Sequence, residues 1–200
     1  GVLPRVAYDQ APLINANTIR SEGLDFAATG RFNFGDVRFT SSVEATYIIN
    51  LDTTFADGSR ESYEGTIGNY SLTAGSGTPE WHGSWTNTLE WNKWTISATA
   101  EFFGGYNLSA EGVEGPGASG GCGMLSPQFV KCNVDDYITV DLTTSYKLND
   151  NFTLYLNVLN VFDDLPPIVP VTYGANNYNP VQGGTGIYGR AYRLGVKANF

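Results

Sequence analysis

Apolar and polar residues alternate along much of this 200-residue chain. The alternation is clearest over residues 37–51, where one face carries apolar side chains and the other carries polar ones. The apolar set is Val37, Phe39, Val43, Ala45, Tyr47, Ile49 and Leu51. A period of two predicts a β-strand with two different faces. Fifteen such residues exceed the roughly 9–11 that a tilted strand needs to cross a bilayer.

The same alternation predicts six further strands. Their expected ranges are 18–32, 81–91, 94–102, 137–148, 152–162 and 192–200. Short turns at 33–36, 92–93 and 149–151 alternate with long loops at 52–79, 104–134 and 163–186. Residues 1–17 carry Pro4 and Pro12 and are expected to be irregular. Short and long connections in strict alternation predict an antiparallel up-and-down sheet with two dissimilar ends.

Aromatic residues lie near both ends of the predicted strands. Near the short turns these are Phe32, Phe39, Trp91, Trp94, Tyr146, Phe152 and Phe200. Near the long loops they are Tyr47, Trp81, Trp85, Phe102 and Tyr137. Two aromatic girdles around smaller residues are typical of transmembrane β-barrels. We therefore predict an all-β fold, an antiparallel up-and-down transmembrane β-barrel segment of about seven strands with short periplasmic turns and long extracellular loops.

Composition agrees with this interpretation. Charged residues make up 16% of the chain, below the roughly 25% of ordinary soluble domains. No apolar run approaches the roughly 20 residues of a membrane-spanning helix. The mean hydropathy of −0.18 fits a barrel, because lipid-facing and lumen-facing residues average out along each strand. A secreted soluble β-sandwich that binds a ligand is the alternative, and it would be folded and soluble without detergent.

The net charge of −9 argues against nucleic acid as a partner, because no basic stripe is present. Charges of opposite sign gather at opposite ends of the predicted strands. Basic residues near the short turns and the C-terminus are Arg31, Arg38, Lys93, Lys147 and Lys197. Acidic residues in or beside the long loops are Asp57, Glu61, Glu64, Glu80, Glu111, Glu114, Asp135, Asp136, Asp163 and Asp164.

Seven strands raise a problem of closure. A bacterial single-chain barrel has an even number of strands, and an open sheet edge cannot face lipid. Either residues 1–17 supply an eighth strand of a small passive barrel, or the chain is the C-terminal part of a larger one. The two prolines weaken the first option. The first residues lack the pattern of a signal peptide, so we expect a mature chain or a fragment.

Cys122 and Cys132 lie ten residues apart in one glycine-rich loop. A structural zinc site is disfavoured, because only two thiols and no nearby histidine are present. A disulfide that closes the loop is the simpler hypothesis and implies an oxidising compartment. Two unlinked thiols remain the alternative.

Several segments resemble TonB-dependent outer-membrane receptors. LNVLNVFDDLPP (156–167), followed by a long loop and GRAYRLGVKANF (189–200), is similar to the closing hairpin of those barrels. INANTIRSEGLDFAATGRF (14–32) and LEWNKWTISATAEFF (89–103) also resemble family segments. The likeness covers residues 14–200 in the right order, and the whole chain (1–200) is interpreted as the C-terminal portion of such a barrel.

The resemblance implies a function in transport and no catalysis. Such receptors are 22-stranded barrels that hold an N-terminal plug domain and import scarce large solutes such as ferric siderophores, cobalamin or oligosaccharides. Energy reaches the plug through TonB. The implied partners are the plug and the remaining barrel strands, both absent from this chain, together with TonB, outer-membrane lipid, lipopolysaccharide and the barrel-assembly machinery. The implied location is the bacterial outer membrane, and no cofactor, metal or catalytic residue is implied.

Two groups of residues are candidates for recognition. Aromatic side chains of the long loops could contact ligand, because rings stack on flat or cyclic solutes: Tyr63, Tyr70, Tyr106, Phe129, Tyr173 and Tyr178. Packing of the loops against one another is the alternative role. The terminal strand resembles the barrel-assembly signal, carried by Tyr192, Leu194, Val196 and Phe200.

Other candidate sites are weaker. His82 is expected to bond to polar neighbours on the lumen face. Glu44, Glu90, Glu101 and Asp141 also face the lumen. Paired carboxylates could carry out glycosidase chemistry, but these strands are not all adjacent, and a plugged barrel needs polar wall residues to bind plug and water. The pairs Asp135–Asp136 and Asp163–Asp164 lack the spacing of a calcium loop. The glycine-rich run 115–123 lacks the lysine of a phosphate-binding loop.

Overall fold

The computed structural model describes residues 17–66, 78–108, 133–168 and 186–199. Seven long strands form one antiparallel sheet in the order β1-β2-β4-β5-β8-β9-β10, so that every strand lies beside the next long strand in the chain. Their bounds are β1 Thr18–Phe34, β2 Val37–Thr54, β4 Trp81–Trp91, β5 Trp94–Phe103, β8 Tyr137–Lys147, β9 Phe152–Leu159 and β10 Ala191–Ala198. The seven predicted strands and their order are confirmed.

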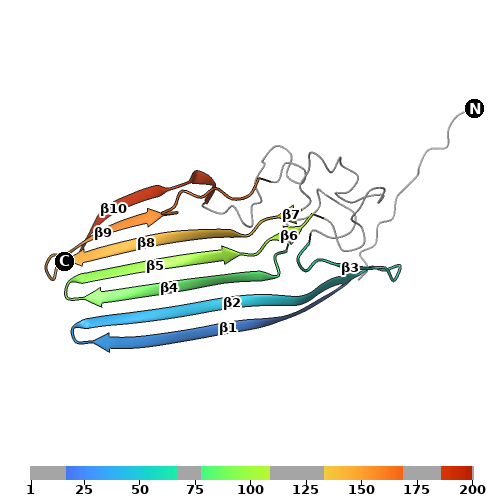
Figure 1. Ribbon diagram of the computed structural model, residues 1–200, viewed down its shortest axis with the longest axis horizontal. Coiled ribbons are helices and arrows are strands. Elements are labelled where there is room, and N and C mark those ends of the chain that lie inside the picture. Colours follow the sequence, from blue (N-terminus) through green and yellow to red (C-terminus); the bar gives the residue numbers. More distant parts are fainter. Residues whose placement is uncertain (1–16, 67–77, 109–132, 169–185, 200) are drawn as a thin grey trace, which may run out of the picture.

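Figure 1 shows the strands side by side in a single curved layer, with the short turns at one end and the long connections at the other. Three short strands lie within the predicted long loops and were missed by the alternation. They are β3 Arg60–Ser62, β6 Tyr106–Asn107 and β7 Asn133–Val134. A 3-10 turn, Gly186–Tyr188, precedes β10. Strands of two or three residues are too short to show a period of two, so sequence pattern could not find them.

Register places the apolar side chains of all seven long strands on one face. One cross-strand row runs Ala28, Val43, Trp85, Ala100 and Val140, and the apolar face continues through Leu154 and Leu156 of β9 to Val196 and Leu194 of β10. No described element covers this face. Val43 is 43% exposed, Ile96 38% and Val196 59%. The sheet therefore has no second layer among the described residues.

Buried apolar residues are few and lie at the loop end. Among the described residues only Tyr106, Leu108, Val134 and Tyr137 are both apolar and buried. A soluble domain of this size would bury a far larger core. No helix in the four described ranges is long and apolar enough to cross a bilayer.

Aromatic contacts mark both ends of the apolar face, as the girdle prediction requires. Tyr47 of β2 stacks on Trp81 of β4 at 4.5 Å between ring centroids, near the loop end. Phe32 lies 6.3 Å from Phe39, near the short turns. Trp94 lies 4.6 Å from Tyr146 at the same end. Mostly smaller and aliphatic residues lie between these two levels. Trp85 is an exception, because it pairs with Val43 midway between them, which corrects its assignment to the loop-end girdle.

A β-bulge ends the apolar face of β1 and β2. The pairing steps from Gly23–Ile48 to Glu22–Asn50, so that β2 has one extra residue at Ile49. Beyond the bulge, Leu51 pairs with Ser21 and changes face, which corrects the sequence assignment of Leu51 to the apolar face. Glu22 and Asn50 instead meet on that side, joined by a hydrogen bond of 2.7 Å. A side chain at Gly23 would lie 2.8 Å from the Tyr47 carbonyl oxygen, so the bulge requires glycine.

Hydroxyl groups form much of the polar face. Thr86 and Thr99 are 3.0 Å apart across β4 and β5, and Thr88 and Ser97 are 2.9 Å apart on the next row. Thr29 and Ser42 make the same contact between β1 and β2 at 2.9 Å. Such pairs leave donors and acceptors free for water or for a polar partner.

Gly195 of β10 accommodates an aromatic ring from β9. Gly195 pairs with Tyr155, and a side chain at Gly195 would lie 2.2 Å from the tyrosine ring. The ring therefore lies across the glycine, an arrangement that fixes strand register. We expect Gly195→Val to displace the ring and lower the free energy of unfolding by about 1–3 kcal/mol.

A double-mutant cycle checks this expectation. Chemical unfolding would be measured for Gly195→Val, Tyr155→Ala and the double variant, where the double variant should lose much less than the sum of the two. Strict additivity would show that the ring and the glycine are not coupled.

Candidate functional site

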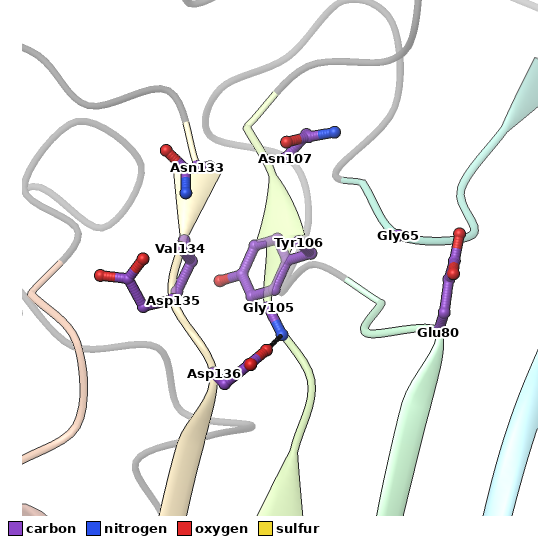
Figure 2. A pocket seen from close by; sticks show the side chains of 9 residues that line it. All are labelled: Gly65, Glu80, Gly105, Tyr106, Asn107, Asn133, Val134, Asp135 and Asp136. Carbon is purple, nitrogen blue, oxygen red and sulfur yellow. Dashed lines mark hydrogen bonds between the residues drawn. The ribbon is translucent and has the colours of Figure 1, made fainter.

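The loop end of the sheet carries a polar hollow of about 440 Å³. It is lined by Gly65, Glu80, Gly105, Tyr106, Asn107, Asn133, Val134, Asp135 and Asp136. Figure 2 shows carboxylate groups on both sides of it, with Glu80 at the start of β4 and the two aspartates between β7 and β8. We call this cavity the loop-end hollow.

Backbone contacts between separate connections build the loop-end hollow. Strands β6 and β7 pair through Tyr106 with Val134 and Asn107 with Asn133. The Asn107 amide donates to the Gly65 carbonyl at 2.7 Å, which ties the segment after β5 to the segment after β2. The Gly105 amide donates to Asp136 Oδ1 at 2.7 Å. Three chain segments are therefore fixed around the hollow.

Two glycines of this lining cannot carry a side chain without rearrangement. A Cβ at Gly105 would lie 2.5 Å from the Val134 carbonyl oxygen. Gly65 has a φ of +64°, which other residues adopt only with strain, and a Cβ there would lie 3.1 Å from Glu80 Oε1. The close approach of the backbone shapes the hollow, and sequence alone gave no indication of it.

Hydrogen-bond acceptors dominate the hollow. Glu80, Asp135 and Asp136 supply carboxylates, and Asn107 and Asn133 supply amides that both donate and accept. Such a lining favours a ligand rich in hydroxyl, amine or amide donors and disfavours a strongly anionic one. Within the described ranges no three His, Cys, Asp or Glu side chains are arranged to hold a metal ion.

Two of the six predicted loop aromatics lie in the described residues. Tyr106 lines the loop-end hollow but is only 3% exposed, so its ring offers little surface. Tyr63 is half-buried and donates its hydroxyl proton to Glu61, and this hydrogen bond raises the pKa of Tyr63 to about 12. Tyr70, Phe129, Tyr173 and Tyr178 lie outside the described residues, as do Cys122 and Cys132 of the predicted disulfide.

A charged hairpin continues β2 beyond the bulge. Asp52, with a side chain only 2% exposed, is paired with Arg60 and accepts a hydrogen bond of 2.8 Å from Ser62 Oγ. Both partners belong to β3, and Glu64 accepts from the Leu51 amide at 3.1 Å. A buried carboxylate needs such partners, because burial without them is costly. The hairpin therefore depends on the ionised form of Asp52.

This dependence makes the hairpin sensitive to acid. Hydrogen bonds from Arg60 and Ser62 hold the pKa of Asp52 below its ordinary value of 3.8. A carboxylate with a lowered pKa stabilises the folded form above pH 3.8 and loses that contribution as the pH falls through its own pKa. We expect the backbone amides of residues 51–63 to lose protection from hydrogen exchange as the pH falls below 3.8, after correction for the intrinsic exchange rate. Asp52→Asn should show weak protection at every pH, and an unchanged acid transition in this variant would contradict the assignment.

A turn that begins at a buried asparagine joins β8, β9 and β10 at the loop end. Asn160, 4% exposed with a φ of +49°, bonds through its side chain to both the amide (3.1 Å) and the carbonyl (2.7 Å) of Asp164. Its own amide donates to Asp141 Oδ1 of β8 at 2.8 Å. We call residues 160–164 the Asn160 turn. It ends β9 at Leu159, three residues before the predicted end at 162.

Asp163 joins the Asn160 turn to the start of β10. Asp163 Oδ1 accepts from the Arg190 amide at 2.6 Å, and Arg190 Nη1 donates to the Val161 carbonyl at 3.1 Å. Tyr137 donates its hydroxyl proton to the Asp164 carbonyl at 3.0 Å. The segment NVFDD, which carries the family resemblance, is therefore a structural connection between three strands. Asp163 is engaged in this connection and Asp136 in the Gly105 contact described above.

The remaining candidates have structural partners or stand on the polar face. The His82 ring lies 4.6 Å from the Phe103 ring. Glu90 accepts from Arg38 Nη1 at 3.2 Å. Glu44 and Glu101 lie on one cross-strand row with Ser84 between them.

The predicted assembly signal on β10 is well exposed. Tyr192 is 68% exposed, Leu194 80% and Val196 59%, all on the apolar face, while Phe200 lies outside the described residues. In the described part of the sheet, β10 pairs only with β9, and β1 pairs only with β2. Both outer strands thus present free edges there.

Comparisons with known proteins point to one family. Residues 3–161 match the family model described as TonB dependent receptor-like, beta-barrel. A search of curated proteins gives no match.

Solved structures resemble the chain weakly. The ferric-catecholate import receptor Fiu of E. coli K12 matches in its open form with 13% identity and a TM-score of 0.41, and in its closed form with 15% and 0.43. These matches cover 94% and 90% of this chain but only 29% and 28% of Fiu. The chain thus spans less than a third of that receptor, and the assignment depends on the family match. Since that match covers more than half of the sequence, this chain belongs to the TonB-dependent receptor β-barrel family.

Proposed function

We propose that the chain forms part of the wall of an outer-membrane transporter that imports a scarce large solute with energy delivered through TonB. The apolar face of the sheet contacts lipid, and the polar face lines the lumen. The observation that carries this proposal is the continuous apolar face, which no described element covers and which ends at an aromatic level on either side. Family membership supplies the mode of transport.

The proposed partners follow from membership in the family. A plug domain fills the lumen and receives TonB, and further strands complete the barrel at β1 and β10. Outer-membrane lipid and lipopolysaccharide surround the apolar face. The barrel-assembly machinery reads the terminal strand through Tyr192, Leu194, Val196 and Phe200. The location is the bacterial outer membrane, and the chain carries out no catalysis.

The loop-end hollow is proposed as a ligand contact on the outer side. Its carboxylates and amides suit the donor groups of an oligosaccharide, or the amide and hydroxyl groups on the surface of a siderophore or cobalamin. The loop aromatics Tyr63, Tyr70, Tyr106, Phe129, Tyr173 and Tyr178 remain predicted contacts around it. Cys122 and Cys132 remain a predicted disulfide.

Transport assays test this function directly. A strain lacking the gene would be compared with the complemented strain for energised uptake of labelled ferric siderophores, cobalamin and oligosaccharides. We expect uptake of one of these classes to require both the gene and a working TonB. Uptake that persists without TonB would indicate a passive barrel, and a folded receptor that remains soluble without detergent would exclude the membrane assignment.

A further inference from the structure

Charged residues of the polar face are divided between its two ends. Glu44 and Glu101 lie on a row near the loop end, beside Asp25 and Asp141 on neighbouring rows. Arg38, Lys147 and Lys197 lie near the short turns, and Arg31 and Arg193 share the row of Thr40 and Thr88. The hydroxyl pairs lie on the two adjoining rows where these groups meet, with Asp141 on one row and Arg31 on the other. A domain that fills the lumen would therefore face acidic side chains toward the loop end and basic side chains toward the short turns.

A second cavity lies within the basic group. It has a volume of about 420 Å³ and is lined by Arg31, Arg38, Thr40, Thr88 and Glu90. We call it the Arg31 hollow. The Arg38 guanidinium is already paired with Glu90. The Arg31 side chain makes no hydrogen bond or ion pair with any residue of the described ranges, so the cavity carries one uncompensated positive charge.

Water now solvates the exposed Arg31. A domain seated against this wall would displace that water, and a guanidinium that loses its water without gaining an acceptor is strongly destabilising. A carboxylate is the acceptor that best fits the planar fork of arginine, because both oxygens can be engaged at once. The hydroxyls of Thr40 and Thr88 can donate further hydrogen bonds to the same group.

We propose that the Arg31 hollow receives a carboxylate side chain of the domain that fills the lumen. This inference rests on the proposed function, which supplies that domain. The occupant is a protein side chain because the cavity is lined by residues close to the short turns, whereas the loop-end hollow, where solute is proposed to bind, is lined by residues of the long connections. Figure 1 shows these two kinds of connection at opposite ends of the strands.

Photo-crosslinking in the complete receptor, in its native membrane, tests the proposal. A photoreactive amino acid would replace Thr40, which lines the cavity, and cross-linked peptides would be identified by mass spectrometry. We expect a peptide from the lumenal domain that contains Asp or Glu. In the Arg31→Glu background the yield should fall about tenfold, because attraction becomes repulsion. Changing the acidic residue of that peptide to lysine should restore the yield.

Two matched positions serve as controls. Thr99 lies on the polar face in the hydroxyl region, so its cross-link to the lumenal domain should not depend on Arg31. Val43 lies on the apolar face and should give no such cross-link.

Failure of the inference and failure of the proposed function can be told apart. A Thr40 cross-link that lacks an acidic residue, or one that Arg31→Glu leaves unchanged, overturns the inference alone. A free anion such as inorganic phosphate in the cavity would give no domain peptide at Thr40 while Thr99 still cross-links, and this also overturns it. If neither Thr40 nor Thr99 reaches a lumenal domain, the filled lumen of the proposed function fails.

Discussion

Replacement of Val43 by arginine is expected to lower the free energy of unfolding in lipid by about 2–4 kcal/mol. Val43 lies on the apolar face, four residues from Phe39 at one aromatic level and four from Tyr47 at the other. This places the substitution near the middle of the bilayer, where a charged side chain is most costly. Chemical unfolding of the purified receptor in vesicles measures the loss.

Ser42→Arg is the matched control. Ser42 is the neighbouring residue on the same strand, but it faces the polar side, where it contacts Thr29. The control should lose less than about 1 kcal/mol, because water and polar groups solvate the guanidinium there. Equal losses for the two variants would contradict the assignment of faces, and a large loss in Ser42→Arg alone would reverse it.

Replacement of Asn160 by alanine is expected to cost about 2–4 kcal/mol. The change removes both side-chain hydrogen bonds to Asp164 and leaves the Asp164 amide without its partner, whereas the carbonyl keeps its hydrogen bond from Tyr137. It also places alanine at a φ of +49°, a conformation that asparagine tolerates better. Unfolding measurements give the total loss, and hydrogen exchange should locate it in β9 and β10.

Asn160→Gly separates the two causes. Glycine adopts the positive φ without strain but lacks the side-chain hydrogen bonds. We expect it to recover only the backbone part, roughly 1 kcal/mol of the loss. Full recovery would show that the hydrogen bonds to Asp164 contribute nothing, and full stability of Asn160→Ala would show that the Asn160 turn does not hold β10.

The long strands could be predicted because lipid imposes one rule on all of them. Most alternate residues between the two aromatic levels are apolar, and β5 follows this pattern from Trp94 to Phe102, whereas β2 and β4 interrupt it at Ser41 and Asn87. The bulge at Gly23 could not be predicted, because one extra residue interrupts the alternation only where the apolar face ends. Leu51 therefore received the wrong face. The alternation of apolar and polar residues therefore predicts strand faces between the two aromatic levels, but it does not predict them beyond those levels.

The candidate sites were harder to predict, because they depend on contacts between distant segments. Glu80, Asn107 and Asn133 meet in the loop-end hollow only because β6 and β7 pair and Asn107 bonds to Gly65. Residue type alone drew attention to Tyr106, which proves to be buried in that lining. The Asn160 turn could be recognised in the sequence as a motif, but its hydrogen bonds needed coordinates.

Consecutive pairing of the long strands has a consequence for evolution. Each long connection joins two strands that are neighbours in the sheet: β2 and β4, β5 and β8, and β9 and β10. Insertions, deletions or whole exchanges in such a connection leave the main hydrogen-bonded ladder intact. Specificity can therefore diverge by segment grafting while the spanning scaffold stays constant, and a chimera that takes only these connections from a relative should still fold.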